Sequence, residues 1–308
     1  MDFCPPGPRR RPLPQQQPPH PAEQPAGARA AQQILDSPSY REPDRDIDFL
    51  QRPDLRGVRL LLDYLKPQTL LAERDIAHTI VVFGGTRICE EAAARRRLAT
   101  CAAALAAQPE DPPRQQELAI AERVLAKSRY YDAAREFGRL VGAAGHTAPG
   151  GRLLVVTGGG PGIMEAANRG AHEAGAQSIG LNITLPHEQF PNPYITPELC
   201  FRFHYFAMRK LHFLLRARAL VAFPGGYGTF DELFEVLTLA QTRKIDPVPV
   251  VLVGEDYWRG AFDPDFLVAE GVIDPEDRDL FRYAETAEEA WRYILTWYEA
   301  KGQPLLPR

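Results

Sequence analysis

The sequence predicts an α/β protein with a Rossmann-like, doubly wound and mainly parallel sheet flanked by helices. Three apolar segments each run into a glycine turn and then into a helical pattern, beginning at Thr79, Leu153 and Leu220. Successive strand, turn and helix form βαβ units, whose turns gather at the carboxyl edge of one sheet, where open α/β sheets bind ligands. We therefore expect the three glycine turns to share one crevice.

The chain ahead of the first strand divides in two by composition. Residues 1–36 are dominated by Pro, Gln, Ala and Arg, which cannot build a core, so we expect a disordered tail. Residues 37–308 should form a single Rossmann-like nucleotide-binding domain that begins with helices. The helical pattern from Asp46 to Leu71 places apolar residues where they would cover the sheet or a neighbouring subunit: Leu55, Val58, Leu61, Leu62 and Leu65.

Helical patterns follow the first strand before the second begins. An Ala-rich segment covers Glu90–Gln108, and after the break PEDPPR a long helical run extends from Gln115 to about Val141. The remaining strands are expected near Ser178–Ile183, Phe201–His204, Leu220–Phe223, Val248–Val253 and Phe281–Tyr283, with helices near Arg259–Ala269 and Thr286–Glu299. Apolar runs such as VPVVLVG are typical of parallel strands buried on both faces.

The third glycine turn, PGGYGTFDE (Pro224–Glu232), is the most informative motif. Its glycines, Gly225, Gly226 and Gly228, let the backbone approach a phosphate at a helix N-terminus. Glu232 lies one helical turn farther on, close enough to act on a ligand whose phosphate binds at this turn. The alternative is a capping box in which Glu232 bonds back to the Thr229 amide.

The second turn, GGGPGIME, supplies Gly159, Gly160 and Gly162 but has Ile163 where the dinucleotide-binding G-x-G-x-x-G pattern needs its third glycine. No GxxxxGK[ST] sequence occurs either, so dinucleotide binding and P-loop ATPase activity are disfavoured. Between the second and third turns, the helical segment Phe203–Leu215 carries Arg209 and Lys210. Arg209 either binds an anion through two parallel hydrogen bonds or extends into solvent.

Taken together, GGGPGIME, AMRK and PGGYGTFDE resemble the LOG ("Lonely guy") family, long misannotated as lysine decarboxylases. The resemblance spans roughly Thr79–Ala300, although Met208 abuts Arg209 where the family commonly has two residues between them. It implies a phosphoribohydrolase that cleaves the N-glycosidic bond of a nucleoside 5′-monophosphate, AMP or a cytokinin riboside 5′-monophosphate, to free base and ribose 5-phosphate. Compact relatives lack a counterpart to much of residues 89–128, which we interpret as a helical insertion.

The resemblance places the essential catalytic residues at Arg209 and Glu232, with no cofactor and no metal. A carboxylate suits the reaction, because departure of the base develops oxocarbenium character at C1′. The group that protonates the base stays open among Asp231, Glu165 and water. The substrate-binding residues implied are Gly84, Gly85, Thr86, Gly159, Gly160, Gly162, Met164, Met208, Lys210, Gly225, Gly226, Gly228 and Thr229.

Two other functions fit the same crevice: a non-catalytic nucleotide-binding or sensor protein, and a broad purine or pyrimidine monophosphate nucleosidase in salvage. A lysine decarboxylase does not fit, because no context for a pyridoxal-phosphate lysine surrounds Lys210. His204 and His212 are expected to be structural histidines, and Tyr130 and Tyr131 to belong to the core.

Composition limits the partners. The 308 residues carry a net charge of −4 with a pI near 6.0, so no nucleic-acid partner is expected. No apolar run reaches the roughly 20 residues of a membrane span, and no signal-peptide pattern opens the chain. The four cysteines show no metal or disulfide spacing. We expect a soluble, cytoplasmic protein, and from its relatives a homo-oligomer, a dimer or higher.

Overall fold

The computed structural model describes residues 25–145, 152–185 and 190–306, with side chains from residue 30 onward. Backbone contacts separate the chain into two units, Met1–Arg59 and Leu60–Arg308, which are described individually. The division falls within helix α3 (Arg56–Ala72), later than the boundary after residue 36 that composition suggests.

The N-terminal unit contains short helices: α1 (Pro25–Leu35), η3 (Pro38–Tyr40), α2 (Ile47–Leu50) and η4 (Pro53–Leu55). Helix α1 lies in the segment expected to be disordered, where the alanines and glutamines of PAGARAAQQIL favour a helix. The rest of that expectation falls outside the described residues. The pattern expected to be helical from Asp46 to Leu71 does form helices, with an interruption between α2 and α3, where Pro53 lacks an amide to donate.

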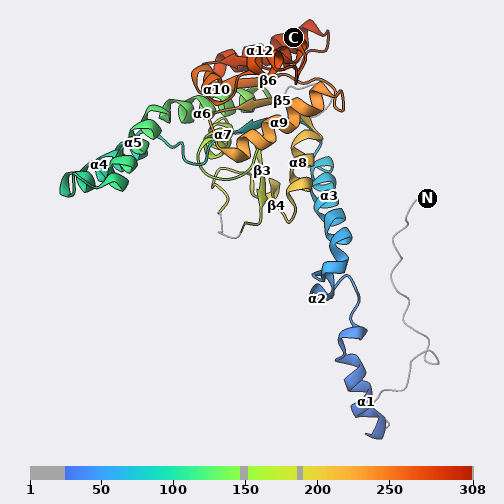
Figure 1. The fold of residues 1–308 in the computed structure, drawn as a ribbon. Helices are drawn as coiled ribbons and strands as arrows, with labels where there is room; N and C mark the ends of the chain where they lie inside the picture. Colours follow the sequence, from blue (N-terminus) through green and yellow to red (C-terminus); the bar gives the residue numbers. More distant parts are fainter. Residues whose placement is uncertain (1–24, 146–151, 186–189, 307–308) are drawn as a thin grey trace. The chain divides into compact units, whose positions relative to one another are not determined.

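The second unit is built on a seven-stranded sheet of order β4-β3-β2-β1-β5-β6-β7, in which every neighbouring pair is parallel (Figure 1). The strands are β1 (Ile76–Phe83), β2 (Arg152–Thr157), β3 (Ser178–Ile183), β4 (Cys200–Phe203), β5 (Ala217–Ala222), β6 (Val250–Val253) and β7 (Arg282–Ala284). The chain winds outward from β1 to β4 and then returns to β5, on the other side of β1. The predicted doubly wound α/β fold is therefore confirmed, with its switch point between β1 and β5.

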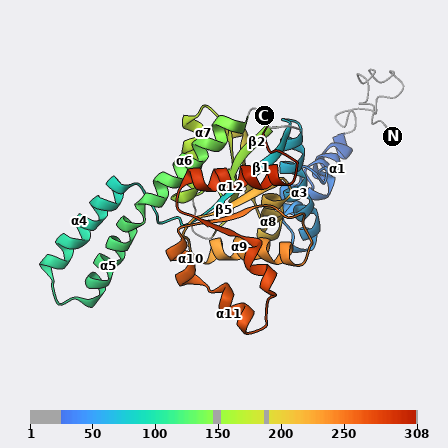
Figure 2. The ribbon, with the colours of Figure 1, turned by 90° about the horizontal axis from the view of Figure 1, so that it is seen from above.

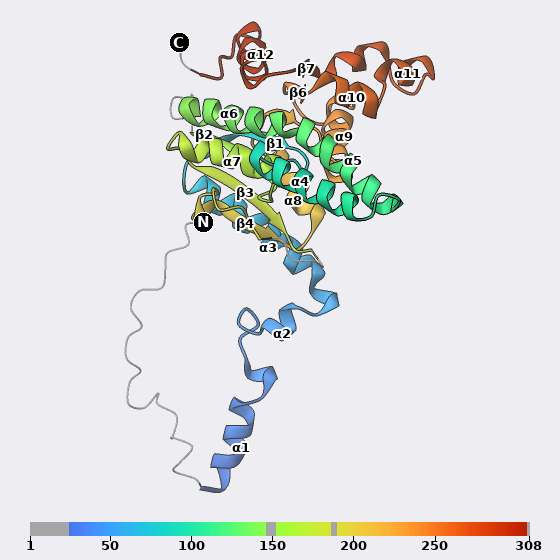
Figure 3. The same ribbon diagram turned by 90° about the vertical axis from the view of Figure 1, so that its left-hand side faces the viewer.

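Two hydrophobic cores cover the two faces of the sheet. Successive side chains of β1 point to opposite faces, so Ile80 and Val82 belong to one core and Val81 and Phe83 to the other. The first core contains α6 (Ser128–Ala144), α7 (Ile163–Glu173) and α12 (Ala287–Ala300), with α6 packed on α7 (Figure 3). The second contains α8 (Phe206–Leu214), α9 (Tyr227–Gln241), α10 (Glu255–Ala261) and the end of α3. Tyr130 and Tyr131 are buried in the first core, as predicted.

Helices α4 (Glu91–Ala107) and α5 (Pro112–Ala126) form a hairpin that extends away from the sheet (Figure 2). The run predicted from Gln115 to Val141 is thus two helices. Lys127 separates them, since its amide closes the last turn of α5 onto Val124 while Ser128 begins α6. The helix predicted at Arg259–Ala269 is likewise two, α10 and α11 (Pro264–Ala269), because the Asp263 side chain and Pro264 start a new helix.

Helix α3 does not cover the sheet with the leucines that its pattern suggests. Leu61, Leu62 and Leu65 are 54%, 51% and 42% exposed, so the prediction that they cover the sheet is wrong, while the alternative of a neighbouring subunit stays a prediction. The helix buries Asp63 instead, which accepts hydrogen bonds from the backbone amides of His204 and Tyr205, where α8 begins. Burial of this carboxylate turns the leucine stripe outward. Among the described residues, no helix is both long and apolar enough to cross a membrane.

Candidate functional site

The three glycine turns meet, as predicted, at the carboxyl ends of β1, β2 and β5. The Gly85 amide donates to the Pro224 carbonyl at 2.9 Å, and the Ile163 amide donates to the Gly85 carbonyl at 3.2 Å. A Cβ at Gly84 would lie 2.5 Å from the Ile163 side chain. Ile163 therefore fills the space beside the first turn that a third glycine would leave open.

The second turn is fixed by a buried polar network. Gly159 and Gly162 have φ angles of +73° and +76°, which explains their residue type. The Asn192 amide donates to the Gly159 carbonyl at 2.9 Å, and its side-chain nitrogen donates to the Gly160 carbonyl at 3.1 Å. That side chain also donates to Asn168 on α7 at 3.0 Å. Sequence reasoning missed both asparagines, because no local pattern distinguishes a buried asparagine from one in a solvated loop.

The third turn leads into α9 without a capping box. Gly226 is the N-cap and the helix begins at Tyr227, so Thr229 lies inside the first turn, with no side-chain cap bond. Thr229 is buried against Gly225, where a Cβ would overlap its hydroxyl. The Tyr257 hydroxyl donates to the Gly225 carbonyl and holds the turn from the other side. The capping role suggested for Glu232 is therefore excluded.

Arg209 of α8 and Glu232 of α9 form an ion pair, with 3.5 Å between Arg209 Nη2 and Glu232 Oε1. Their side chains are only 11% and 15% exposed. The guanidinium also lies against Gly158, whose added Cβ would be 2.5 Å from Nη2, and its Nε has no hydrogen-bond partner among the described residues. The pair is thus brought to the second glycine turn.

Burial governs the protonation of this pair. It raises the pKa of Glu232 to about 7, and the charge of Arg209 opposes the rise without cancelling it. The same burial lowers the pKa of Arg209 from its ordinary value. A carboxyl group with a pKa near 7 exchanges protons at neutral pH, as a general acid or base must.

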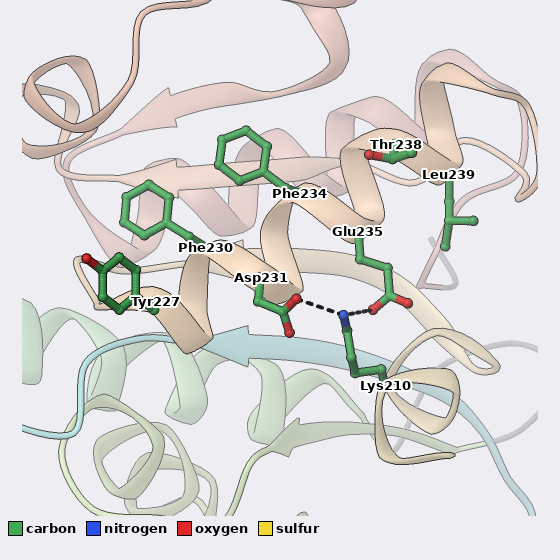
Figure 4. Close-up of a pocket in the computed structure, with 8 residues that line it drawn as sticks. All are labelled: Lys210, Tyr227, Phe230, Asp231, Phe234, Glu235, Thr238 and Leu239. Carbon is green, nitrogen blue, oxygen red and sulfur yellow. Dashed lines mark hydrogen bonds and ion pairs between the residues drawn. The ribbon is translucent and has the colours of Figure 1, made fainter. Parts of the chain in front are cut away.

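The two residues that flank Arg209 in the sequence have different surroundings. Met208 is half-buried and packs in the core under α8. Lys210 forms ion pairs with Asp231 at 3.0 Å and Glu235 at 3.2 Å, beside a cavity of about 510 Å³ along α9 (Figure 4). The structure thus gives Lys210 two carboxylate partners of its own. Met164 lies near Arg209, since its Sδ and the guanidinium both lie against Gly158.

The open candidates for the proton donor are engaged elsewhere. Asp231 is exposed and holds Lys210, while Glu165 accepts a hydrogen bond from the Tyr131 hydroxyl at 3.0 Å. None of the hydrogen bonds among the described side chains joins either to Glu232. His204 is exposed beside Asp63, and buried His212 lies 3.0 Å from the Tyr64 carbonyl, consistent with the structural roles expected.

A second cavity, of about 420 Å³, adjoins the first and third turns. Gly85, Thr86, Gly225 and Gly226 line it, together with residues that sequence reasoning did not select: Arg87, Arg123, Lys127 and Tyr257. Arg123 lies on α5 and Lys127 directly follows that helix, both inside the insertion, and no local sequence pattern shows that this segment lies beside the glycine turns. Gly228, the remaining glycine of the third turn, is exposed in the first turn of α9.

Comparison of the sequence with known proteins identifies the family of this chain. A family model described as "Possible lysine decarboxylase" matches residues 164–294. The rice protein cytokinin riboside 5′-monophosphate phosphoribohydrolase LOG is 34% identical over 170 residues, covering 53% of this chain and 65% of its own length. The Arabidopsis thaliana enzyme LOG3 is 33% identical over 168 residues, covering 53% of this chain and 73% of its own. The chain belongs to the LOG family.

The matched region does not include the whole of every relative. For the rice proteins LOG and LOGL5 it spans 65% and 55% of their length, less than two thirds of either. Among solved structures, the Moco carrier protein of Chlamydomonas reinhardtii is 22% identical with a TM-score of 0.40, covering 73% of this chain and 98% of its own. A molybdenum cofactor binding protein of Rippkaea orientalis is 17% identical with a TM-score of 0.41, covering 71% and 96%.

Proposed function

We propose that the protein hydrolyses the N-glycosidic bond of a nucleoside 5′-monophosphate, releasing the free base and ribose 5-phosphate. Relatives in its family are named as phosphoribohydrolases of cytokinin riboside 5′-monophosphates. Cytokinin riboside 5′-monophosphate and AMP are the proposed substrates, since both present an adenine-type base on the same ribose phosphate.

The observation that carries the proposal is the buried Glu232 beside Arg209, at the end of the second turn of α9. Its pKa of about 7 keeps a substantial fraction ionised at neutral pH, in a site where the charge is poorly screened by water. A carboxylate in this environment stabilises a developing cation more strongly than one in solvent does. Such a cation forms at C1′ as the base departs.

The N-terminus of α9 provides the anchor for the substrate. The amides at the start of a helix attract a phosphate, and here they follow Gly225 and Gly226, which leave the backbone accessible. The 5′-phosphate bound there would orient the ribose toward Glu232, so that binding energy from a remote group positions the reacting carbon.

The reaction then proceeds at C1′. The C1′–N bond breaks with its electron pair going to the base, which takes up a proton, and a water oxygen forms the new bond to C1′. Glu232 accepts the proton that this water loses and returns it to solvent, and solvent water supplies the proton that the base takes up. Arg209 holds the Glu232 carboxylate in place and supports its ionised form.

The pH dependence follows from the role of Glu232 as a base. Its ionised fraction rises as the pH passes about 7, so kcat/KM should rise through the same range.

Ribose 5-phosphate release should be measured with the nucleoside 5′-monophosphates of adenine, isopentenyladenine, guanine and pyrimidine bases. Hydrolysis of purine and pyrimidine substrates alike would indicate a salvage nucleosidase, whereas binding without release from any of them would favour a sensor protein.

We also propose that the protein is a cytoplasmic homo-oligomer, a dimer or higher. The exposed leucines of α3, Leu61, Leu62 and Leu65, are apolar side chains that a second copy of the chain would remove from water. Light scattering should give a multiple of the 34.4 kDa chain mass, and a mass of one chain would contradict this part of the proposal. Cell fractionation tests the compartment.

A further inference from the structure

The cavity of about 420 Å³ beside the first and third glycine turns carries an unbalanced positive charge. Three cations line it, Arg87, Arg123 and Lys127, and no carboxylate does. None of the ion pairs among the described residues includes any of these three. Like charges gathered around one cavity repel each other, and an anion between them would remove that cost.

Some cations of the same unit have carboxylate partners, whereas others, such as Arg96 and Arg97, take part in none of the ion pairs among the described residues. Lys210 has two carboxylate partners, Arg209 has Glu232, and Arg169 pairs with Glu90 and Glu173. The cavity differs from an ordinary charged surface, where both signs are interspersed, because three cations line it together and no carboxylate does.

The C-terminal part of the inserted helix α5, together with Lys127 directly after it, lines the cavity. Ile120, Arg123, Val124 and Lys127 follow the spacing of one helical face, and all four line the cavity. The opposite wall is the third glycine turn, held by the hydrogen bond from Tyr257 to Gly225. The insertion thus contributes cations to the very turn where the phosphate is proposed to bind.

We infer that the insertion completes the phosphate site: Arg123 of α5 and Lys127 directly after it, with Arg87, bind the phosphate monoester that the Gly225–Gly226 turn receives. The identity of the ligand as a nucleoside 5′-monophosphate rests on the proposed function. The anion site itself stands on the cavity and its charges. The insertion accordingly is a substrate-binding element in addition to an elaborated connection between β1 and β2.

The test uses the full chain and two probes, ribose 5-phosphate and unphosphorylated ribose, with binding measured by calorimetry. The double variant Arg123→Gln/Lys127→Gln removes two charges from the cavity. Arg96→Gln/Arg97→Gln is the matched control, because it removes two charges from exposed positions of the same hairpin that do not line the cavity. The single variants Arg123→Gln and Lys127→Gln replace the double variant if urea unfolding shows that it is not folded.

Wild type should bind ribose 5-phosphate and not ribose. The cavity variant should bind it roughly tenfold more weakly, as expected for two charge-assisted contacts at a partly exposed site, while the control stays within about twofold of wild type. Equal binding by wild type and the cavity variant, or an equal loss in the control, would overturn the inference, as would the absence of ribose 5-phosphate binding to wild type.

Kinetics separate this inference from the proposed function. With a hydrolysed monophosphate, the cavity variant should raise KM about tenfold and leave kcat within about twofold, because the lost contact is made equally in the ground and transition states. If wild type releases no base but the cavity variant still loses ribose 5-phosphate binding, the proposed function fails and the phosphate site stands.

Discussion

The stability of the Glu232→Gln variant, measured relative to wild type, should increase as the pH rises. In the folded protein burial raises the pKa of Glu232 to about 7, from an ordinary value of 4.5 that the unfolded chain should retain. Between these values the folded state binds more protons than the unfolded state. The stability of wild type therefore falls as the pH rises through this window, and the glutamine variant lacks that loss.

The size of the effect follows from the two pKa values. The unfolding free energy of wild type should be about 2.5 kcal/mol lower at pH 8 than at pH 5 because of the ionisation of Glu232, at 1.36 kcal/mol for each pKa unit. The variant also leaves Arg209 without its anion, but Arg209 stays charged at both pH values, so that cost largely cancels in the comparison.

Urea unfolding at pH 5 and pH 8, at constant ionic strength, measures this directly. Trp258 and Trp291 are buried on opposite faces of the sheet and report unfolding by fluorescence. The difference in unfolding free energy, variant minus wild type, should increase by about 2.5 kcal/mol from pH 5 to pH 8. A difference that stays constant, or that decreases, would refute the argument that burial controls the ionisation of Glu232.

Three further substitutions test the surroundings of the site. Arg209→Lys should lower kcat about 100-fold or more without unfolding the protein, because an ammonium group cannot reproduce the planar, bidentate hydrogen bonding of the guanidinium. Steady-state kinetics test this prediction, and retention of activity would contradict it. Gly158→Ala places a Cβ 2.5 Å from Arg209 Nη2 and 2.8 Å from Met164 Sδ, so it should lower kcat at least tenfold, whereas Gly260→Ala, which meets nothing within 4 Å, should not. Asn168→Ala should lower the unfolding free energy by about 2–3 kcal/mol, because it leaves buried hydrogen-bond partners unsatisfied; a loss below about 0.5 kcal/mol in urea unfolding would contradict that reading.

The sheet was predictable from sequence because its central strands contain runs of apolar residues, such as those of β1, β2 and β6, that end at turn residues. The strand Ser178–Ile183 has the predicted bounds, and the other strands lie within a few residues of expectation. Helix interruptions were less accessible. Lys127 ends α5 without a proline or glycine, so the separation from α6 depends on tertiary packing and leaves no local signal.

For the site, the motifs brought Arg209, Glu232, Met164 and the three glycine turns together as predicted. The Thr229 capping alternative failed because the helix begins earlier, at Tyr227, than the position of the threonine suggests. For the leucines of α3, only one of the two expected roles is excluded. They do not cover the sheet, since the helix buries Asp63 and its bonds to the start of α8 instead, and contact with a neighbouring subunit stays a prediction.

The most direct test of the central claim is ribose 5-phosphate release by wild type and the variants Glu232→Gln and Glu235→Gln. Glu235 lies on the same helix and binds Lys210, so its substitution controls for the loss of one negative charge from α9. Wild type and Glu235→Gln should release the sugar phosphate, while folded Glu232→Gln should lose at least 100-fold in kcat. Equal rates for Glu232→Gln and wild type would contradict the catalytic role of this carboxylate, and with it the proposed mechanism.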